Sequence, residues 1–324
     1  MPQCCRQPFT AIEIGYNGDV FTCCPSFINN YKIGNIFEAT AKDIWYSDLA
    51  VNLRQKILHG DYTICNRNIC RQFQPRDIEE KNFTLTPSFP RYITLAYDKE
   101  CNLNCITCRD NKYKNSEELV QKYNQRIEEV LLPLLQNAEI LALSGSGEAL
   151  YSSHSRLLIK NLSKVNDKLS YNLNTNGILL NENNCRELGI LGRINEIFVS
   201  LPALDEDLYK KIMRGSDLNT VLKNIEWMAK EQGKSIKKVT INSVISKLNY
   251  SQIPSLVEFA KKLNIYITLS PFNDWGTQFA KEYDYDVWNS DNNENNKFTV
   301  ILKNLEHYER LTTPPLFANL LNKE

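Results

Sequence analysis

Three cysteines within eight residues constrain this chain more than any other feature. Cys101, Cys105 and Cys108 have the spacing Cys-x3-Cys-x2-Cys and follow an apolar, β-prone run at residues 92–97. A strand leading into such a loop can gather three thiolates on one face of an iron–sulfur cluster, which prefers cysteine ligands. Three ligands for four irons leave one iron open to another molecule. The alternatives are ordinary core cysteines or part of a zinc site, although closed zinc sites usually contain paired Cys-x2-Cys motifs.

At these residues the sequence resembles the radical S-adenosylmethionine (SAM) superfamily. The superfamily motif is Cys-x3-Cys-x-aromatic-Cys, and Thr107 stands where the aromatic residue usually stands. The resemblance implies that Cys101, Cys105 and Cys108 are catalytic and ligate a [4Fe-4S] cluster whose open iron binds the amino and carboxylate groups of SAM. One electron would then cleave SAM to methionine and a 5′-deoxyadenosyl radical, while the protein holds SAM in place and excludes water from the site.

Charge and cysteine usage exclude several classes of protein. Lys+Arg and Asp+Glu both number 38, so the net charge of zero gives no reason to expect nucleic acid or an anionic membrane as a partner. No stretch resembles a signal peptide or a membrane span, which predicts a cytoplasmic protein. Ten cysteines in the reducing cytoplasm argue against disulfides, and nine of them precede residue 110, which favours metal or cluster ligation.

Residues 1–75 are predicted to form a small cysteine-rich module. Residues 12–23 alternate apolar and polar side chains around Asn17-Gly18, the strongest short signal for a β-hairpin, and residues 42–59 read as a helix. A hairpin brings its ends together, so the cysteines before it and after it can meet. The four ligands proposed for one site are Cys5, Cys23, Cys65 and Cys70, with Cys4 and Cys24 as adjacent alternates. A zinc knuckle could use the same four thiolates.

Together these residues resemble a SPASM or twitch domain, which holds an auxiliary cluster. Such domains normally follow the radical SAM core, whereas this module precedes it, as if permuted. The resemblance implies one auxiliary [4Fe-4S] cluster on Cys5, Cys23, Cys65 and Cys70. The other matching positions are Gly18, five residues before Cys23, then Gly34-Asn35-Ile36, Ile44-Trp45 and Leu53-Arg54.

After a proline-containing linker at residues 76–90, strands alternate with helices through residues 91–272. Such alternation implies parallel pairing through right-handed crossovers. The predicted fold class is therefore α/β, a partial (β/α)6 TIM-like barrel preceded by the cysteine-rich module, with a C-terminal extension at 273–324 covering the barrel. The predicted strands are 92–97, 140–143, 171–173, 196–201, 239–245 and 265–269. The predicted helices are 116–136, 155–167, 182–191, 205–213, 218–232 and 251–263.

In such barrels, chemistry collects where strands end. Residues 144–149 follow the second strand and resemble the Gly-Gly-Glu segment that receives the SAM ammonium group, with Ala149 replacing the usual proline. An arginine fork suits the SAM carboxylate, although Arg214 alone would read as a solvated charge at a helix end. The resemblance implies that the residues binding SAM are Ser144, Gly147, Glu148, Asn176, Ser200 and Arg214.

The resemblance implies a radical SAM oxidoreductase that abstracts hydrogen from a peptide or protein side chain, as in maturation of ribosomal peptides or sulfatases. A carbohydrate or sugar alcohol is the alternative substrate, and a flavodoxin- or ferredoxin-type protein is the expected electron donor. A non-catalytic zinc or Fe–S scaffold is a further alternative, because Thr107 and Ala149 depart from the superfamily pattern. Cys185 lies in a predicted helix, where a buried core residue is favoured over the hydrogen-donating cysteine of some radical SAM epimerases.

Overall fold

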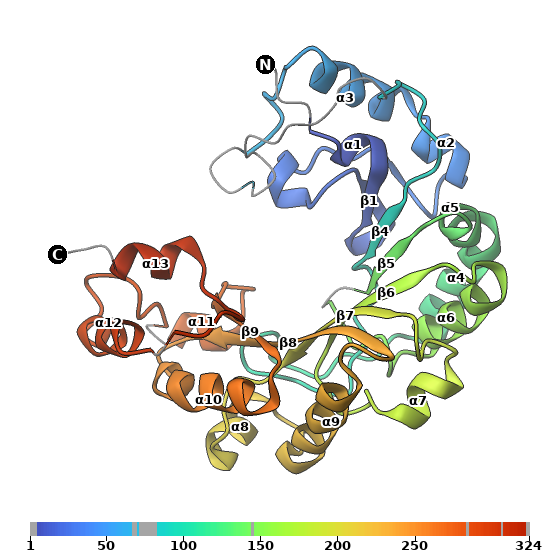
Figure 1. The fold of residues 1–324 in the computed structure, drawn as a ribbon. Coiled ribbons are helices and arrows are strands. Elements are labelled where there is room, and N and C mark those ends of the chain that lie inside the picture. The colour runs from blue at the N-terminus through green and yellow to red at the C-terminus, as the bar shows by residue number, and fades with distance from the viewer. Residues whose placement is uncertain are drawn as a thin grey trace. The chain divides into compact units, whose positions relative to one another are not determined.

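The computed structural model describes residues 5–66, 70, 83–143, 146–282, 285–305 and 307–321. They belong to two compact units, shown in the ribbon of Figure 1. The first unit comprises residues 1–99 and 115–172, and the second comprises residues 100–114 and 173–324. The chain therefore leaves the first unit for the fifteen residues around the three clustered cysteines, and then returns to it.

The first unit begins with the cysteine-rich segment and continues into alternating strands and helices. Its strands are β1 (Ala11–Ile14), β2 (Asp19–Phe21), β3 (Gly34–Asn35), β4 (Tyr92–Leu95), β5 (Ile140–Leu143) and the first half of β6 (Ser170–Thr175). Its helices are α1 (Gln7–Thr10), α2 (Ala41–Trp45), α3 (Asp48–Leu58), α4 (Glu117–Arg126), α5 (Leu132–Leu135) and α6 (Ser153–Val165). A π-helical turn, Ile127–Leu131, joins α4 to α5 within the stretch predicted as one helix.

The predicted N-terminal hairpin is confirmed. Strands β1 and β2 pair antiparallel, with Ile14 opposite Val20, and β2 also pairs antiparallel with β3. The turn places Asn17 at φ 58° and Gly18 at φ 79°, the two positive φ angles that an Asn-Gly turn supplies at low cost. A Cβ atom on Gly18 would lie only 2.6 Å from the ring of Phe37, so the turn also needs glycine for space.

Strand β1 also pairs in parallel with β4, the strand that leads into the cysteine loop. Ile12 lies opposite Ile93 and Ile14 opposite Leu95, and β4 pairs in parallel with β5. These four apolar side chains are buried on one face of the sheet. Glu13 alternates to the other face, where partial burial raises the pKa of its carboxyl group. The first strand of the cysteine-rich segment is thus a strand of the same sheet as β4.

The single helix predicted at residues 42–59 is wrong, because the chain forms α2 and α3 instead. Helix α2 ends at Trp45, and Ser47 begins α3 as its N-cap. The Ser47 Oγ atom accepts a hydrogen bond from the Ala50 amide at 3.2 Å. A serine that caps a new helix competes with continuation of the old one, which explains the break.

The second unit contains the end of β6, then β7 (Ile194–Ser200), β8 (Ile236–Ile245), β9 (Tyr266–Pro271) and β10 (Leu311–Thr312). Its helices are α7 (Glu182–Glu187), α8 (Glu206–Ile212), α9 (Leu218–Glu231), α10 (Ile253–Leu263), α11 (Gln278–Glu282), α12 (Asn295–Lys303) and α13 (Pro315–Leu321). Within the described ranges, no helix of either unit has the length and apolarity needed to cross a bilayer.

In the second unit, β7, β8, β9 and β10 pair in parallel in chain order. Ile197 and Val199 on β7 and Ile241 on β8 are fully buried, and the helices α9 and α10 contact β8 and β9 respectively (Figure 1). The alternate positions on these strands carry more polar side chains. The C-terminal extension contributes β10, a further parallel strand that sequence periodicity did not reveal.

A buried polar network in the first unit fixes the end of β4. The Tyr97 hydroxyl lies 2.6 Å from Nε2 of His154, and Nδ1 of His154 lies 2.7 Å from Oδ1 of Asn124. Because the amide oxygen can only accept, Nδ1 carries the proton and Nε2 accepts from the tyrosine. His154 is fully buried, and burial lowers its pKa from 6.5 to about 4. The folded protein therefore holds a neutral imidazole at physiological pH.

This imidazole predicts an acid-sensitive fold. In the unfolded chain His154 takes up a proton near pH 6.5, whereas in the folded chain it does so only near pH 4. Unfolding therefore becomes easier as the pH falls through this window, by up to about 3 kcal/mol. We expect the melting temperature of the wild type to fall more steeply between pH 6.5 and 4 than that of a His154→Gln variant. Parallel curves for the two proteins would contradict the proposed neutral histidine.

Candidate functional site

The loop that carries the three cysteines is fastened to the end of α8. The Asn104 amide donates to the Arg214 carbonyl oxygen at 3.3 Å, and the Ile106 amide donates to the Ile212 carbonyl oxygen at 3.0 Å. Gly215 has φ 89°, and a Cβ atom there would lie 3.5 Å from the Leu103 side chain. Two backbone hydrogen bonds therefore hold the loop, and the Met213-Arg214-Gly215 segment lies beside it.

The three thiols differ in exposure: Cys101 is buried, Cys105 is half-buried and Cys108 is exposed. The Leu103 amide donates to Cys101 Sγ at 3.4 Å, the Met213 sulfur lies 3.5 Å from Cys105 Sγ, and Nη2 of Arg109 donates to Cys108 Sγ at 3.5 Å. Burial, followed by the nearby Cys108 and Cys101 thiols, raises the pKa of Cys105 to about 12. The three sulfurs therefore gather in one place, and the Cys105 thiol stays protonated unless a metal stabilises its thiolate.

No group of three or more His, Cys, Asp or Glu side chains within the described ranges is arranged to hold a metal ion. A tetrahedral zinc ion needs its ligands around one point at about 2.0–2.3 Å. In a cluster each thiolate holds a different iron, so the three sulfurs lie further apart. Cys101, Cys105 and Cys108 offer the three thiolates that a cluster with one open iron requires.

Two residues predicted to bind SAM lie next to this loop in the second unit. Nδ2 of buried Asn176 donates to Asn102 Oδ1 at 2.8 Å and lies 4.0 Å from Cys101 Sγ. Arg214 has an exposed side chain, and its carbonyl oxygen accepts the Asn104 amide. The structure therefore brings Asn176 and Arg214 to the cysteine loop.

Ser200 lies at the end of β7, in register with Asn242 on β8. The Asn242 Oδ1 atom accepts a hydrogen bond from the Ser270 hydroxyl of β9 at 2.9 Å. Sequence reasoning missed Asn242 and Ser270. Their position in the second halves of neighbouring strands, toward the end where barrel enzymes bind ligands, was the available signal.

In the first unit, Glu148 lies in the turn after β5. Its side chain is buried, and its carbonyl oxygen accepts the amides of Tyr151 at 2.9 Å and Ser152 at 3.0 Å. Gly147 is half-buried beside it, whereas Ser144 lies outside the described residues. Contact of Glu148 with the SAM ammonium group stays a prediction.

Three of the four thiols proposed as auxiliary ligands, those of Cys5, Cys23 and Cys70, lie near one another in the first unit. Burial raises the pKa of Cys23 to about 12, with further contributions from Cys5 and Cys70, and burial and Cys70 raise the pKa of Cys5. These three sulfurs are therefore close enough to repel one another as thiolates. The Cys24 sulfur instead lies 3.2 Å from the Ser26 hydroxyl, which favours Cys23 over Cys24 as a ligand. Cys4 lies outside the described residues.

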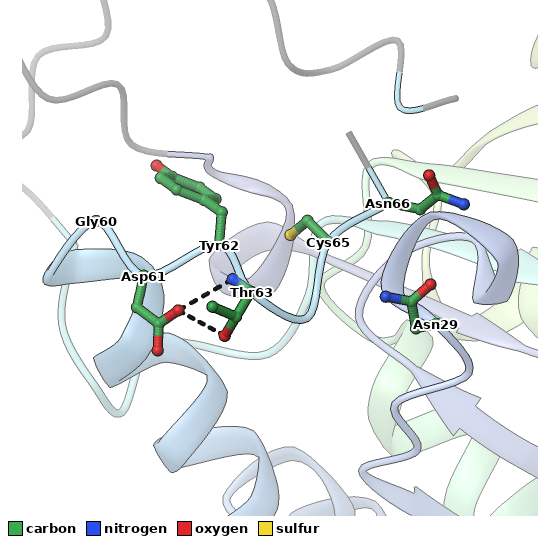
Figure 2. A pocket seen from close by; sticks show the side chains of 7 residues that line it. All are labelled: Asn29, Gly60, Asp61, Tyr62, Thr63, Cys65 and Asn66. Carbon is green, nitrogen blue, oxygen red and sulfur yellow. Dashed lines mark hydrogen bonds between the residues drawn. The ribbon is translucent and has the colours of Figure 1, made fainter. Parts of the chain in front are cut away.

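Cys65 lines an open pocket of about 610 Å³ together with residues on the same loop, including Tyr62 and Asn66 (Figure 2). Asn29 faces this loop, and its Nδ2 donates to the Ile64 carbonyl oxygen at 3.2 Å. The Cys70 amide donates to the Asn66 carbonyl oxygen at 3.1 Å, which ties the last predicted ligand to the same loop. The local geometry thus keeps Cys65 at a solvent-accessible edge.

Cys185 is fully buried in α7, and burial raises the pKa of its thiol to about 12. Such a thiol has little thiolate character and no path to solvent. This placement supports the interpretation of Cys185 as a core residue.

Comparison with known proteins identifies both segments. The model of the radical SAM superfamily matches residues 99–260, half of the chain. The chain belongs to the radical SAM superfamily. A second model, the SPASM iron–sulfur cluster-binding domain, matches residues 4–71, so the predicted order of auxiliary module and radical SAM core is confirmed. These matches and the parallel β/α repeats confirm the α/β, partial-barrel fold class.

The curated relatives include a GTP 3′,8-cyclase of Clostridium botulinum, 31% identical over 189 residues that cover 56% of this chain and 57% of the relative. A probable GTP 3′,8-cyclase of Methanococcus aeolicus is 28% identical over 214 residues, or 65% of each chain. The chain thus spans less than two thirds of either relative. Among solved structures, Streptococcus suis SuiB bound to SAM matches 70% of this chain and 50% of its own at 20% identity, with a TM-score of 0.47.

The radical SAM chain is an enzyme, and its family implies a [4Fe-4S] cluster with SAM and an auxiliary iron–sulfur cluster. When bound, these groups would supply the radical chemistry, while the protein would position them and exclude water. The gathered thiols around Cys105 and around Cys23 fit such groups, because positive iron would offset the mutual repulsion of buried thiolates. The Asn176 amide next to Cys101 would orient and tune a ligating sulfur.

Proposed function

We propose that this radical SAM enzyme oxidises a peptide or protein side chain. The observation that carries the proposal is the auxiliary iron–sulfur domain at residues 4–71. A second redox site can accept one electron from the substrate radical. In this reaction the substrate loses one hydrogen atom to the radical formed from SAM. It then loses one electron through the auxiliary module and one proton to a nearby base.

The ligand sets of the two clusters are part of the proposal. Cys101, Cys105 and Cys108 would hold the SAM-binding cluster, and Cys5, Cys23, Cys65 and Cys70 the auxiliary one. Glu148 would accept the SAM ammonium group, and Arg214 would pair with the SAM carboxylate. The domain boundaries at residues 75, 90 and 272 belong to the same proposal. Because exposed clusters and free thiols need a reducing compartment, we propose that the enzyme works in the cytoplasm with a flavodoxin- or ferredoxin-type donor.

Cyclisation of GTP is a second candidate, favoured by the names of the curated relatives. A triphosphate needs several lysine or arginine side chains. The half-buried positions in register with Ser200, the last residue of β7, are Asn242 on β8 and Thr268 on β9, however, and Ser270 lies two residues further along β9. They carry hydroxyls and an amide. On this sheet face Lys238 is already paired with Glu196 at 2.6 Å. These residues favour an uncharged or weakly charged substrate.

The test compares three substrate classes under anaerobic conditions. Reconstituted enzyme, SAM and reduced flavodoxin are incubated with peptides encoded beside the gene, with GTP, or with a sugar alcohol. We expect a peptide to lose two hydrogens in step with 5′-deoxyadenosine release, while GTP and the sugar alcohol stay unchanged. Consumption of GTP or of the sugar alcohol, without any change in a peptide, would overturn the peptide proposal.

A further inference from the structure

We propose that Asp98 is a positioning residue for SAM binding, which joins both ends of the cysteine loop to the turn that carries Glu148. The inference rests on the proposed role of Glu148 and adds a residue that acts through Asn115, Ser152 and Ser155. Asp98 lies three residues after Leu95, the last residue of β4, and precedes Cys101 by three residues. Asp98 and the donors Asn115, Ser152 and Ser155 belong to the first unit.

One carboxylate collects three side-chain hydrogen bonds. Asn115 Nδ2 donates to Oδ1 of Asp98 at 2.9 Å, the Ser155 hydroxyl donates to Oδ2 at 2.8 Å, and the Ser152 hydroxyl donates to the same oxygen. All three donor residues are buried. Bonds to an ionised acceptor are roughly twice as strong as neutral ones. Removal of this carboxylate would therefore leave three buried polar side chains short of an acceptor.

The Asn115 bond closes the base of the cysteine loop. Asp98 lies before the loop and Asn115 after it, and residues 100–114 between them carry Cys101, Cys105 and Cys108. A loop with joined ends has fewer open conformations to lose when its three sulfurs take up fixed positions. Asp98 thereby lowers the entropic cost of holding these thiolates in one arrangement.

The serine bonds reach the turn of Glu148. Ser152 is the N-cap of α6, and its Oγ accepts the Ser155 amide at 3.3 Å. The Ser152 amide in turn donates to the Glu148 carbonyl oxygen at 3.0 Å. Ser152 therefore bonds to Asp98 through its side chain and to the Glu148 turn through its backbone amide. The adjacent Tyr97 adds a second connection to the same helical turn through His154.

The consequence for SAM follows from this shared anchor. The three thiolates are proposed to hold the cluster whose open iron binds SAM. Glu148 is proposed to accept a hydrogen bond from the ammonium group of SAM. If Asp98 fixes both the loop base and the Glu148 turn, its loss should weaken SAM binding without removing a single ligand. A residue that acts through such contacts typically changes affinity roughly 10- to 100-fold.

The test compares Asp98→Ala and Asp98→Asn with Asp167→Asn, an exposed acid of the same unit. SAM affinity is measured on the full, cluster-loaded chains by anaerobic equilibrium binding, and amide hydrogen exchange is measured on the chains before reconstitution. We expect Asp98→Ala to weaken SAM binding roughly 10- to 100-fold. Asp98→Asn should lose less, because its amide oxygen still accepts, and Asp167→Asn should match the wild type. Exchange should rise only within residues 99–115 and 146–156.

Two results would overturn the inference. One is unchanged SAM affinity in Asp98→Ala. The other is faster exchange spread evenly over both units, which would show a general loss of stability rather than positioning. A wild-type enzyme that binds no SAM would instead contradict the proposed function itself, so the two failures are distinguishable.

Discussion

Replacement of Cys105 by alanine is expected to abolish SAM cleavage. Cys105 is the half-buried middle member of the three gathered thiols, and its sulfur contacts Met213. Without it the SAM-binding cluster would keep only two protein ligands. We expect the rate of 5′-deoxyadenosine formation to fall on the order of 10⁴-fold or more, as it does when an essential catalytic residue is removed from other enzymes. The iron content should fall from roughly eight to roughly four atoms per chain, because the auxiliary [4Fe-4S] cluster is retained.

The matched control is Cys185→Ala, which removes a fully buried cysteine from α7. This change leaves a small cavity and should cost about 1–2 kcal/mol of unfolding free energy. Iron content and SAM cleavage should stay at the wild-type level. If Cys105→Ala retained cleavage, or if Cys185→Ala lost iron to the same extent, Cys101, Cys105 and Cys108 would not be the ligands of the SAM-binding cluster.

The second large effect is expected from Cys23→Ala compared with Cys24→Ala. The Cys23 thiol shares its buried surroundings with Cys5 and Cys70, whereas the Cys24 thiol lies beside the Ser26 hydroxyl. We expect Cys23→Ala to lose the auxiliary cluster, or roughly four irons per chain. It should still cleave SAM but should no longer oxidise the substrate. Cys24→Ala should keep the wild-type iron content and product yield.

This pair of neighbours has one decisive readout, the iron and acid-labile sulfide bound per chain. Loss of iron in Cys24→Ala with full retention in Cys23→Ala would reverse the ligand assignment. Zinc in place of iron in the wild-type chain, with loss of zinc in Cys23→Ala, would support the zinc-knuckle alternative for this module.

Local sequence signals predicted most elements of the fold. Asn17-Gly18 predicted the hairpin because few other residue pairs accept two positive φ angles. The predicted helices at 116–136 and 205–213 begin within one residue of the observed ones, and Ser116 and Asp205 cap their first turns with a side-chain oxygen. The break between α2 and α3 was missed because Ser47 is as compatible with a helix interior as with a cap until its Oγ is seen to accept the Ala50 amide.

Long-range pairing could not be predicted in the same way. Nothing in residues 11–14 shows that β1 will pair in parallel with β4, about eighty residues later. The choice between Cys23 and Cys24 also depends on which side chain turns toward Cys5, which adjacent cysteines cannot reveal. The spacing of Cys101, Cys105 and Cys108 indicated the chemistry, but Asp98 and its three donors became visible only when the chain brought residues 98, 115, 152 and 155 together.

One measurement tests the central claim most directly, the binding of SAM to an iron–sulfur cluster held by the loop of residues 101–108. Anaerobically reconstituted wild-type protein is reduced and examined by electron paramagnetic resonance with and without SAM, and its products are then quantified. The account predicts a [4Fe-4S] signal that changes on SAM addition and equal amounts of methionine and 5′-deoxyadenosine. A spectrum that SAM leaves unchanged, with no 5′-deoxyadenosine formed, would contradict it.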